Sequence, residues 1–182
     1  MLKRRISQLI FITVTGVAPL ALWVAWPGPQ LIFGDLFFTV TTVGKAAGIV
    51  GLGCFSGNLI LSGRYRRLDR WFGGLDKLYS FHRKTGVATL ILLSVHALVM
   101  ILRPALLSWV SFFSSLTDFS NLGLNAGRLA YAGLLAIVAW TLLFRGRLKY
   151  ELVKRVHMVL GAFLFVGGLH AYLIGSDLAE NY

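Results

Sequence analysis

Residues 80–100 read SFHRKTGVATLILLSVHALVM, an apolar stretch long enough for one membrane-spanning helix, with histidines at positions 82 and 96. An imidazole in hydrocarbon is costly unless a partner engages it, so a histidine inside such a stretch indicates a functional site. The chain has four histidines. The other two, His157 and His170, occur at nearly the same spacing in a second apolar stretch.

The composition is that of a membrane protein. The chain has 182 residues, of which 57% are hydrophobic, and its mean hydropathy is +0.73. These values predict an all-α, polytopic transmembrane bundle forming a single domain over residues 1–182. The formal net charge of +11 is distributed over loops, so we expect no nucleic-acid partner. Cys54 is the only cysteine, which excludes an internal disulfide and a CxxCH site for covalent haem.

Five stretches have the length and apolar character of spanning helices. They cover roughly residues 6–26, 43–61, 79–102, 127–144 and 152–174. The first reads as a signal anchor that is retained, with a kink at Pro19 and an end at the Trp-Pro-Gly-Pro cluster of residues 26–29. Within the loop of residues 103–126, the aromatic segment 109–119 predicts an interfacial helix, which either caps a cofactor or only anchors the loop.

The distribution of lysine and arginine predicts the orientation, because cytoplasmic loops carry the excess. With the N-terminus in the cytoplasm, only Lys45, Arg103 and Arg128 lie outside. The 15 basic residues then assigned to the cytoplasmic side are Lys3, Arg4, Arg5, Arg64, Arg66, Arg67, Arg70, Lys77, Arg83, Lys84, Arg145, Arg147, Lys149, Lys154 and Arg155. We therefore expect a bacterial inner (plasma) membrane protein in which the two histidine-bearing helices run in the same direction and the C-terminus of this chain lies outside.

Residues 51–57 read GLGCFSG and follow two further glycines, Gly44 and Gly48. A nucleotide-binding glycine loop needs a strand, a turn and a helix in water, and this apolar stretch offers none of them. Small residues at four-residue spacing in an apolar helix are typical of close packing against another helix or a flat cofactor. We expect that packing role here.

The spacing of the histidines predicts two matched depths. At 1.5 Å per residue, His82 and His96 lie about 21 Å apart along their helix, and His157 and His170 about 19.5 Å apart. Facing imidazoles with no cysteine or intramembrane carboxylate suit bis-axial ligation of haem iron. We expect two b-type haems, an inner one on His82 and His157 and an outer one on His96 and His170.

Helical phase favours the first pair over the second. Fourteen residues return to within about 40° of the starting face, whereas thirteen miss it by about 140°. The helix that carries His157 and His170 must therefore twist, bulge or use different rotamers. Each imidazole is expected to donate its second ring N–H to a carbonyl one turn back. Those carbonyls belong to Leu78, Leu92, Val153 and Val166.

Other residues are expected beside the haems. Gly86 and Gly161 follow the first histidine of each helix by one turn and let a porphyrin approach the backbone. Arg83, Lys84 and Arg155 flank the inner site and either pair with haem propionates or serve only as cytoplasmic-side charges. Arg103 is their outer counterpart, or it reaches to the outer headgroups.

Two readings without haem stay open. Intramembrane histidines also serve as interhelical polar contacts or as a proton relay, so a proton-coupled transporter and a haem-free assembly subunit are the alternatives. Four histidines paired by helix and depth favour ligation. A proton relay usually recruits buried carboxylates, and none of the seven acidic residues lies in the middle of an expected helix.

The segment HRKTG at residues 82–86, the two histidine spacings, and ELVKRVHMVLGAFLFVGGLH at residues 151–170 resemble the ferric reductase-like transmembrane domain, which occurs in ferric reductases and NADPH oxidases. The resemblance covers nearly the whole chain. It implies an oxidoreductase membrane component that takes electrons from cytosolic NADPH through FAD to the inner haem and then the outer haem. The implied partners are membrane lipid, a flavin-containing reductase domain or subunit, and an extracytoplasmic acceptor such as ferric iron, quinone or oxygen.

Two departures from the family pattern affect these expectations. The family usually has a sixth helix followed by a flavin domain, so we expect the donor parts to come from elsewhere in a longer protein or from another polypeptide. Oxidases of the family tend to have another histidine one turn beyond the outer ligand, where this chain has Met100. That difference favours metal or quinone reduction over superoxide production.

Overall fold

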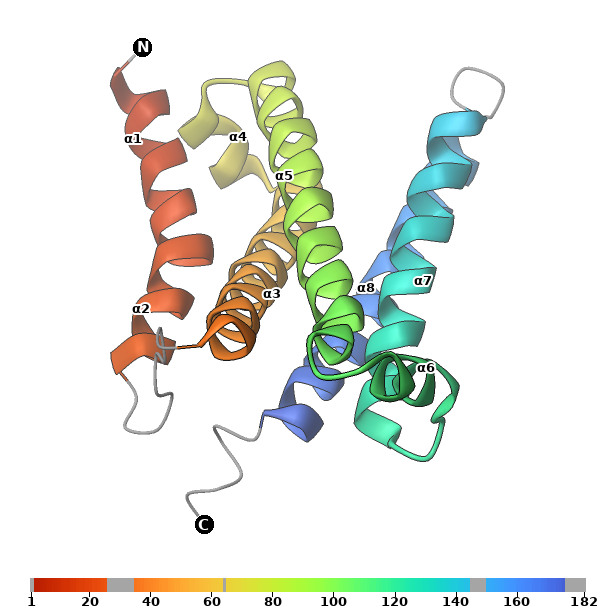
Figure 1. Ribbon diagram of the computed structural model, residues 1–182. Coiled ribbons are helices and arrows are strands. Elements are labelled where there is room, and N and C mark those ends of the chain that lie inside the picture. The colour runs from red at the N-terminus through yellow and green to blue at the C-terminus, as the bar shows by residue number, and fades with distance from the viewer. Residues whose placement is uncertain (1, 26–34, 64, 145–149, 176–182) are drawn as a thin grey trace. The chain divides into compact units, whose positions relative to one another are not determined.

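A computed structural model describes residues 2–25, 35–63, 65–144 and 150–175 (Figure 1). Every regular element in these ranges is helical, and five helices are long and apolar enough to cross a membrane. The predicted all-α, five-span fold class is thereby confirmed. The Trp-Pro-Gly-Pro cluster, the basic residues 145–149 and the residues after Gly175 lie outside the described ranges.

The chain forms two compact units, residues 1–116 and 117–182. Unit 1 contains α1 (Leu2–Ile12), the π-helical η1 (Thr13–Val17), α2 (Ala18–Ala25), α3 (Leu36–Ser62), α4 (Arg66–Phe72), α5 (Leu75–Leu102) and the 3-10 helix η2 (Arg103–Leu106). The helix α6 (Trp109–Thr117) closes unit 1, which confirms a helix in the aromatic loop segment. Unit 2 contains α7 (Leu122–Leu143) and α8 (Tyr150–Ile174).

All five spanning helices begin earlier than hydropathy predicts, with α1 at Leu2 and α8 at Tyr150. The helix α3 begins at Leu36 rather than near residue 43, α5 at Leu75 rather than 79, and α7 at Leu122 rather than 127. At α7 the cause is a cap, because the Asn121 Oδ1 accepts the Leu124 N–H at 2.9 Å. Hydropathy marks the apolar part of a helix, and at α7 a capping group starts the helix before that part, whereas α3 and α5 begin without a side-chain capping bond.

The first spanning helix contains a π-helical segment before Pro19. The Ala18 N–H bonds to the Thr13 carbonyl, and Pro19 has no N–H to offer the Thr15 carbonyl one turn earlier. That carbonyl is directed at Gly53 of α3, where a Cβ atom would overlap it. The irregularity expected at Pro19 is therefore a π segment whose displaced carbonyl packs on a glycine of the neighbouring helix.

The glycines of α3 lie on two faces of the helix. A Cβ at Gly48 or Gly51 would meet side chains of α5, whereas one at Gly53 or Gly57 would meet Thr15 and its neighbours in the first helix. The helix therefore packs closely on two neighbours, as Figure 1 shows for unit 1. The glycine-rich stretch is a helix-packing surface, which confirms the prediction from sequence.

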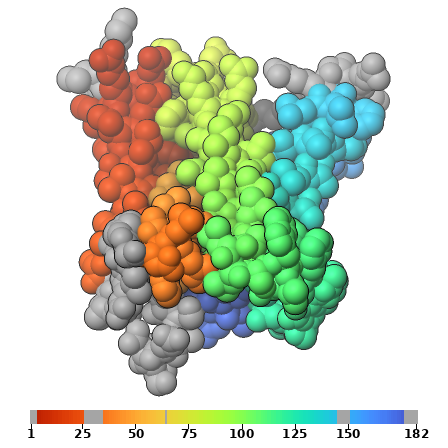
Figure 2. Space-filling view, viewed as in Figure 1, coloured from red at the N-terminus to blue at the C-terminus, as the bar shows by residue number. Residues whose placement is uncertain are grey.

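A small aromatic core closes the end of unit 1 at which α1 begins. The short helix α4, which sequence reasoning did not predict, places Phe72 against Phe81 of α5, with ring centroids 5.2 Å apart. Gly73 ends α4 in the left-handed region at φ 79°. The Ser7 hydroxyl donates to the Trp71 carbonyl at 2.9 Å and ties α1 to this end, where Figure 2 shows the two segments in contact.

Unit 2 is a pair of packed helices. Gly133 of α7 accommodates the ring of Phe163 from α8, because a Cβ there would overlap the ring.

In the loop before α7, Asp118 accepts hydrogen bonds from the Ser120 N–H and hydroxyl, which lower the pKa of its carboxyl. The loop is thus organised by short polar contacts, and the helix pair by a glycine that admits an aromatic ring.

We expect Gly53→Ala to destabilise the folded protein by about 1–3 kcal/mol, because the new methyl overlaps the Thr15 carbonyl, which is backbone and cannot rotate away. Gly168→Ala is the matched control, since nothing lies within 4 Å of its Cβ position. Unfolding of the purified proteins in detergent micelles measures both. Equal stability of the Gly53 and Gly168 variants would contradict the packing described.

Candidate functional site

His82 lies near the start of α5 and is held by α3. Its Nδ1 is 3.1 Å from the Asn58 carbonyl oxygen, and the Thr85 hydroxyl donates to the Asn58 Oδ1 at 2.7 Å. The ring of Tyr79 meets the imidazole edge to face, with centroids 6.3 Å apart. Asn58 thus contacts both His82 and Thr85, and it fixes the start of α5 against the end of α3.

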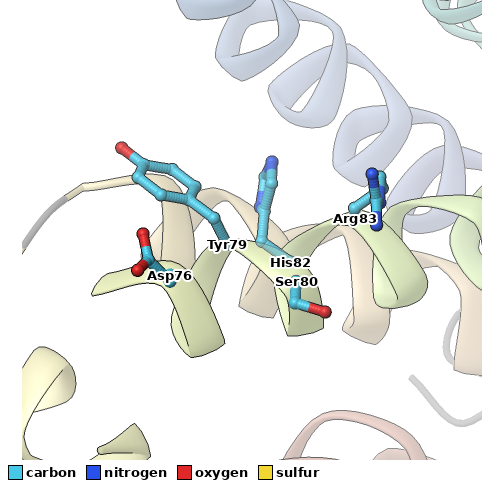
Figure 3. Close-up of a pocket in the computed structure, with 5 residues that line it drawn as sticks. All are labelled: Asp76, Tyr79, Ser80, His82 and Arg83. Atoms are coloured by element: carbon cyan, nitrogen blue, oxygen red, sulfur yellow. The ribbon is translucent and has the colours of Figure 1, made fainter. Parts of the chain in front are cut away.

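His82 also borders an open pocket of about 420 Å³. Its lining residues are Asp76, Tyr79, Ser80, His82 and Arg83. Figure 3 shows the Tyr79 and His82 rings and the Arg83 guanidinium standing on one side of α5, whereas Ser80 points away from them. The imidazole, a phenol and a positive charge are therefore gathered at the same end of the helix.

His96, the second histidine of α5, is held closer to α3. Its Nδ1 lies 2.8 Å from the Gly44 carbonyl oxygen. Gly48, one turn further along α3, has no side chain to meet the ring, and a Cβ there would lie 2.6 Å from the same Nδ1. A larger residue at Gly48 would displace the imidazole from its present position.

In unit 2 the two histidines of α8 differ from each other. The His170 Nδ1 lies 2.8 Å from the Gly123 carbonyl oxygen of α7. The His157 Nδ1 is buried without a hydrogen-bond partner among the described residues, and the Val153 carbonyl approaches this ring without hydrogen-bond geometry. His170 is therefore held by the neighbouring helix, and His157 is not.

The carbonyl partners of these rings differ from the prediction. The partners of His82, His96 and His170 lie on the adjacent helix and not one turn back on the same helix, so the expectation for Leu78, Leu92 and Val166 was wrong. A helical carbonyl one turn back already lies along the helix axis, whereas an imidazole that leaves its own helix sideways meets the carbonyls of the next one.

The three contacts determine the tautomer. A carbonyl oxygen only accepts hydrogen bonds, so the Nδ1 facing it carries the proton. A neutral imidazole protonated at Nδ1 has its lone pair on Nε2, which is the electron pair that a metal ion uses. Each of these three rings therefore donates its Nδ1–H to the carbonyl oxygen that it faces. The described residues contain no cluster of three His, Cys, Asp or Glu side chains placed to hold a metal ion by themselves.

The thirteen-residue spacing of His157 and His170 is not accommodated by a bulge. The helix α8 is α-helical from Tyr150 to Ile174 without a π segment. Of the three solutions that the sequence left open, the described structure excludes a break in the helical hydrogen bonding. The two remaining ways to accommodate the phase difference between His157 and His170 are different side-chain rotamers and a gradual twist of the helix.

The two glycines expected beside the first histidines have different surroundings. A Cβ at Gly86 would lie 3.0 Å from the Asn58 Nδ2, so this glycine lets α5 approach α3. A Cβ at Gly161 would have no neighbour within 4 Å. A side chain at Gly161 would therefore meet no neighbour, as at Gly168, whereas at Gly86 the close approach is between helices.

Among the basic residues expected at the site, Arg103 has the most defined surroundings. Its guanidinium lies over the Phe37 ring, 5.1 Å from the centroid, and its Nε is buried without a hydrogen-bond partner among the described residues. Arg103 closes an apolar pocket of about 190 Å³. The other lining residues are Val40, Leu98, Val99, Leu102 and Leu106. The side chains of Arg83, Lys84 and Arg155 are exposed.

Sequence reasoning missed the groups that hold the imidazoles. Asn58 could have been recognised in the sequence, because a polar amide in an apolar helix needs a partner. Nothing in the sequence points to the carbonyls of Gly44 and Gly123. A backbone carbonyl is the same in every residue. Only the packing of two helices selects which carbonyl a histidine reaches.

Comparison with known protein families gives a match to the family described as ferric reductase like transmembrane component, over residues 47–168. This span covers more than half of the chain. The chain belongs to this family. The matched region contains His82, His96 and His157 and ends two residues before His170. Neither the curated proteins nor the solved structures with which the chain was compared gave a match. As a ferric reductase-like component with five spanning helices, it is a multi-pass membrane protein.

We expect nitrogen-15 NMR of histidine-labelled protein, produced without haem, to show the Nδ1–H tautomer for His82, His96 and His170, because their Nδ1 atoms face carbonyl oxygens. Signals are assigned by substituting each histidine in turn with glutamine. His157 serves as the internal comparison, since no carbonyl fixes its proton. A predominant Nε2–H form at His96 or His170 would contradict the contacts.

Proposed function

We propose that this protein carries electrons across a membrane through two b-type haems. His82 and His157 would ligate one haem, and His96 and His170 the other. Each bound haem would supply an iron that accepts and passes on one electron at a time. The observation that carries the proposal is the contact of three histidine Nδ1 atoms with carbonyl oxygens of a neighbouring helix.

The residues present fit that cofactor. Bis-axial ligation asks for imidazoles that donate Nδ1–H to a second partner, and three of the four rings have Nδ1 within hydrogen-bond distance of a carbonyl oxygen. The fourth, His157, has a buried Nδ1 without a hydrogen bond and open space at Gly161 one turn later on α8. Membership of the ferric reductase-like family supports the same assignment.

The chain itself would fix, insulate and orient the cofactors. The helix α3 holds the rings of His82 and His96, α7 holds that of His170, and the apolar spans exclude water from the electron path. Arg83, Lys84 and Arg155 are suited to pair with propionates of the haem at His82 and His157. Arg103 is suited to pair with those of the other haem, because its Nε is buried and has no protein partner among the described residues.

The orientation proposed from the basic loops gives the electron path a direction. With the N-terminus in the cytoplasm, His82 and His157 lie at the inner side, and electrons enter there from a flavin-containing reductase domain or subunit that holds FAD and NADPH. They leave at the haem of His96 and His170 toward ferric iron, quinone or oxygen. Met100 stands one turn beyond His96, where oxidases of the family tend to have another histidine, and this difference favours metal or quinone reduction over oxygen chemistry.

We expect the purified wild-type protein to contain two haems b per chain, with a low-spin reduced spectrum. His82→Ala and His96→Ala should each lower the content to about one, because each removes one axial ligand. Ile91→Ala, on the exposed face of α5, is the control and should keep both haems. Pyridine haemochrome analysis gives the stoichiometry.

Four outcomes would contradict this proposal. Wild-type protein purified from haem-replete cells without haem would remove its basis, and full loading of both histidine variants would remove the ligand assignment. Substrate flux by a haem-free protein would support the proton-coupled transporter instead. A colourless protein required only by a partner would support the assembly subunit.

Arg103→Gln should lower the midpoint potential of the outer haem, because the guanidinium charge stabilises the reduced, less positive form. Arg128→Gln is the matched control, since Arg128 is already hydrogen-bonded to the Asp118 carbonyl and the Asn125 Oδ1. Spectroelectrochemical titration measures both variants. An unchanged potential in Arg103→Gln, with both haems retained, would show that Arg103 serves only to anchor the helix end.

A further inference from the structure

The second histidine of α5 is held by two glycines spaced four residues apart on α3. Gly44 supplies the carbonyl oxygen that lies 2.8 Å from the His96 Nδ1. Gly48 supplies space, because a Cβ there would lie 2.6 Å from that Nδ1 and 2.9 Å from Cε1. Residues four apart lie on one face of a helix, so a single helical turn provides both the acceptor and the clearance.

Unit 2 repeats this arrangement with different residues around it. The Gly123 carbonyl oxygen of α7 lies 2.8 Å from the His170 Nδ1, and a Cβ at Gly127 would lie 2.6 Å from Nδ1 and 2.7 Å from Cε1. The sequences of the two turns are GKAAG and GLNAG. We call each turn an imidazole seat, defined as Gly44 with Gly48 in unit 1 and Gly123 with Gly127 in unit 2.

The seats differ from ordinary glycine packing between membrane helices. In such packing, small residues let two backbones or apolar side chains approach, as Gly133 does for the Phe163 ring. At Gly48 and Gly127, the three atoms nearest the absent Cβ all belong to an imidazole. The clearance therefore serves the histidine ring itself, and in both units it accompanies a hydrogen bond to that ring.

The first histidines have no such seat. His82 bonds to the Asn58 carbonyl at 3.1 Å, and His157 has no hydrogen bond at Nδ1 among the described residues. The seats thus distinguish the second histidine of each helix from the first. Under the proposed function, these second histidines are the two axial ligands of one and the same haem.

We propose that Gly48 and Gly127 are positioning residues for the outer haem, which hold the rings of His96 and His170 against the carbonyls of Gly44 and Gly123 and thereby set its reduction potential. This inference rests on the proposed function. A ring N–H donated to a carbonyl makes the imidazole a more basic ligand. A more basic axial ligand stabilises the oxidised iron and lowers the potential.

The test substitutes the clearance glycine and leaves the ligands in place. In Gly48→Ala and Gly127→Ala the new methyl displaces the ring, so the Nδ1–H bond lengthens and the potential of the outer haem should rise. The low-spin electron paramagnetic resonance signal of that haem should shift as well. Gly168→Ala and Gly16→Ala are the controls, because their Cβ positions meet nothing closer than 3.7 Å. The inner haem should keep its potential and signal in all four variants.

A double-substitution cycle separates positioning from general helix packing. Gly48→Ala should lower the thermal stability of the full chain when His96 is present and have a much smaller effect in the His96→Ala background, because the overlapping ring has been removed. This readout does not depend on the activity of the loaded protein. It also identifies the cause if Gly48→Ala loses the outer haem altogether.

Each result supports or overturns the inference. A raised outer-haem potential, together with stability coupling between positions 48 and 96, supports it. Two bound haems with unchanged potentials and signals in Gly48→Ala and Gly127→Ala overturn it and leave the proposed function intact. Equal destabilisation by Gly48→Ala with and without His96 overturns it as well, and shows that the glycine serves helix contact only. Haem-free wild-type protein overturns the proposed function, and the role in setting a potential with it.

Discussion

An imidazole inside a membrane-spanning helix has to donate its ring N–H within the protein, because no bulk water is present to accept it. For His82, His96 and His170 the acceptor is a backbone carbonyl of the adjacent helix. Such a carbonyl already accepts one helical N–H and has a second lone pair for the ring. A contact of this kind, at 2.8 Å for both His96 and His170, requires two helices to pack with almost nothing between them.

The glycines of α3 and α7 meet that requirement. On α3 they also serve a second neighbour, since Gly53 receives the Thr15 carbonyl that Pro19 leaves without a helical partner. The helix therefore contacts the first span on one face and α5 on another. One set of small residues both assembles unit 1 and fixes the angle at which the histidines of α5 leave their helix.

Under the proposed function, these contacts connect the fold to redox chemistry. The properties of a metal-binding imidazole depend on the group that accepts a hydrogen bond from its other ring nitrogen. The strength of each Nδ1–H bond would then be a means of tuning the haem. The Nδ1 atoms of His82 and His96 lie 3.1 Å and 2.8 Å from their carbonyl oxygens, and that of His157 has no hydrogen bond among the described residues. The histidines therefore differ in how they are held, although the sequence presents them as two similar pairs.

The sequence by itself determined the all-helical membrane fold, the five spans and the family, because apolar length and the repeated histidine spacing are properties of the chain. It also identified the glycines of α3 as packing residues. It did not reveal helix α4, whose Phe72 is buried only once α1 and α5 converge on it. Only the tertiary structure decided which carbonyl each imidazole reaches. Backbone carbonyls are chemically alike, and helix packing alone brings those of Asn58, Gly44 and Gly123 to a ring.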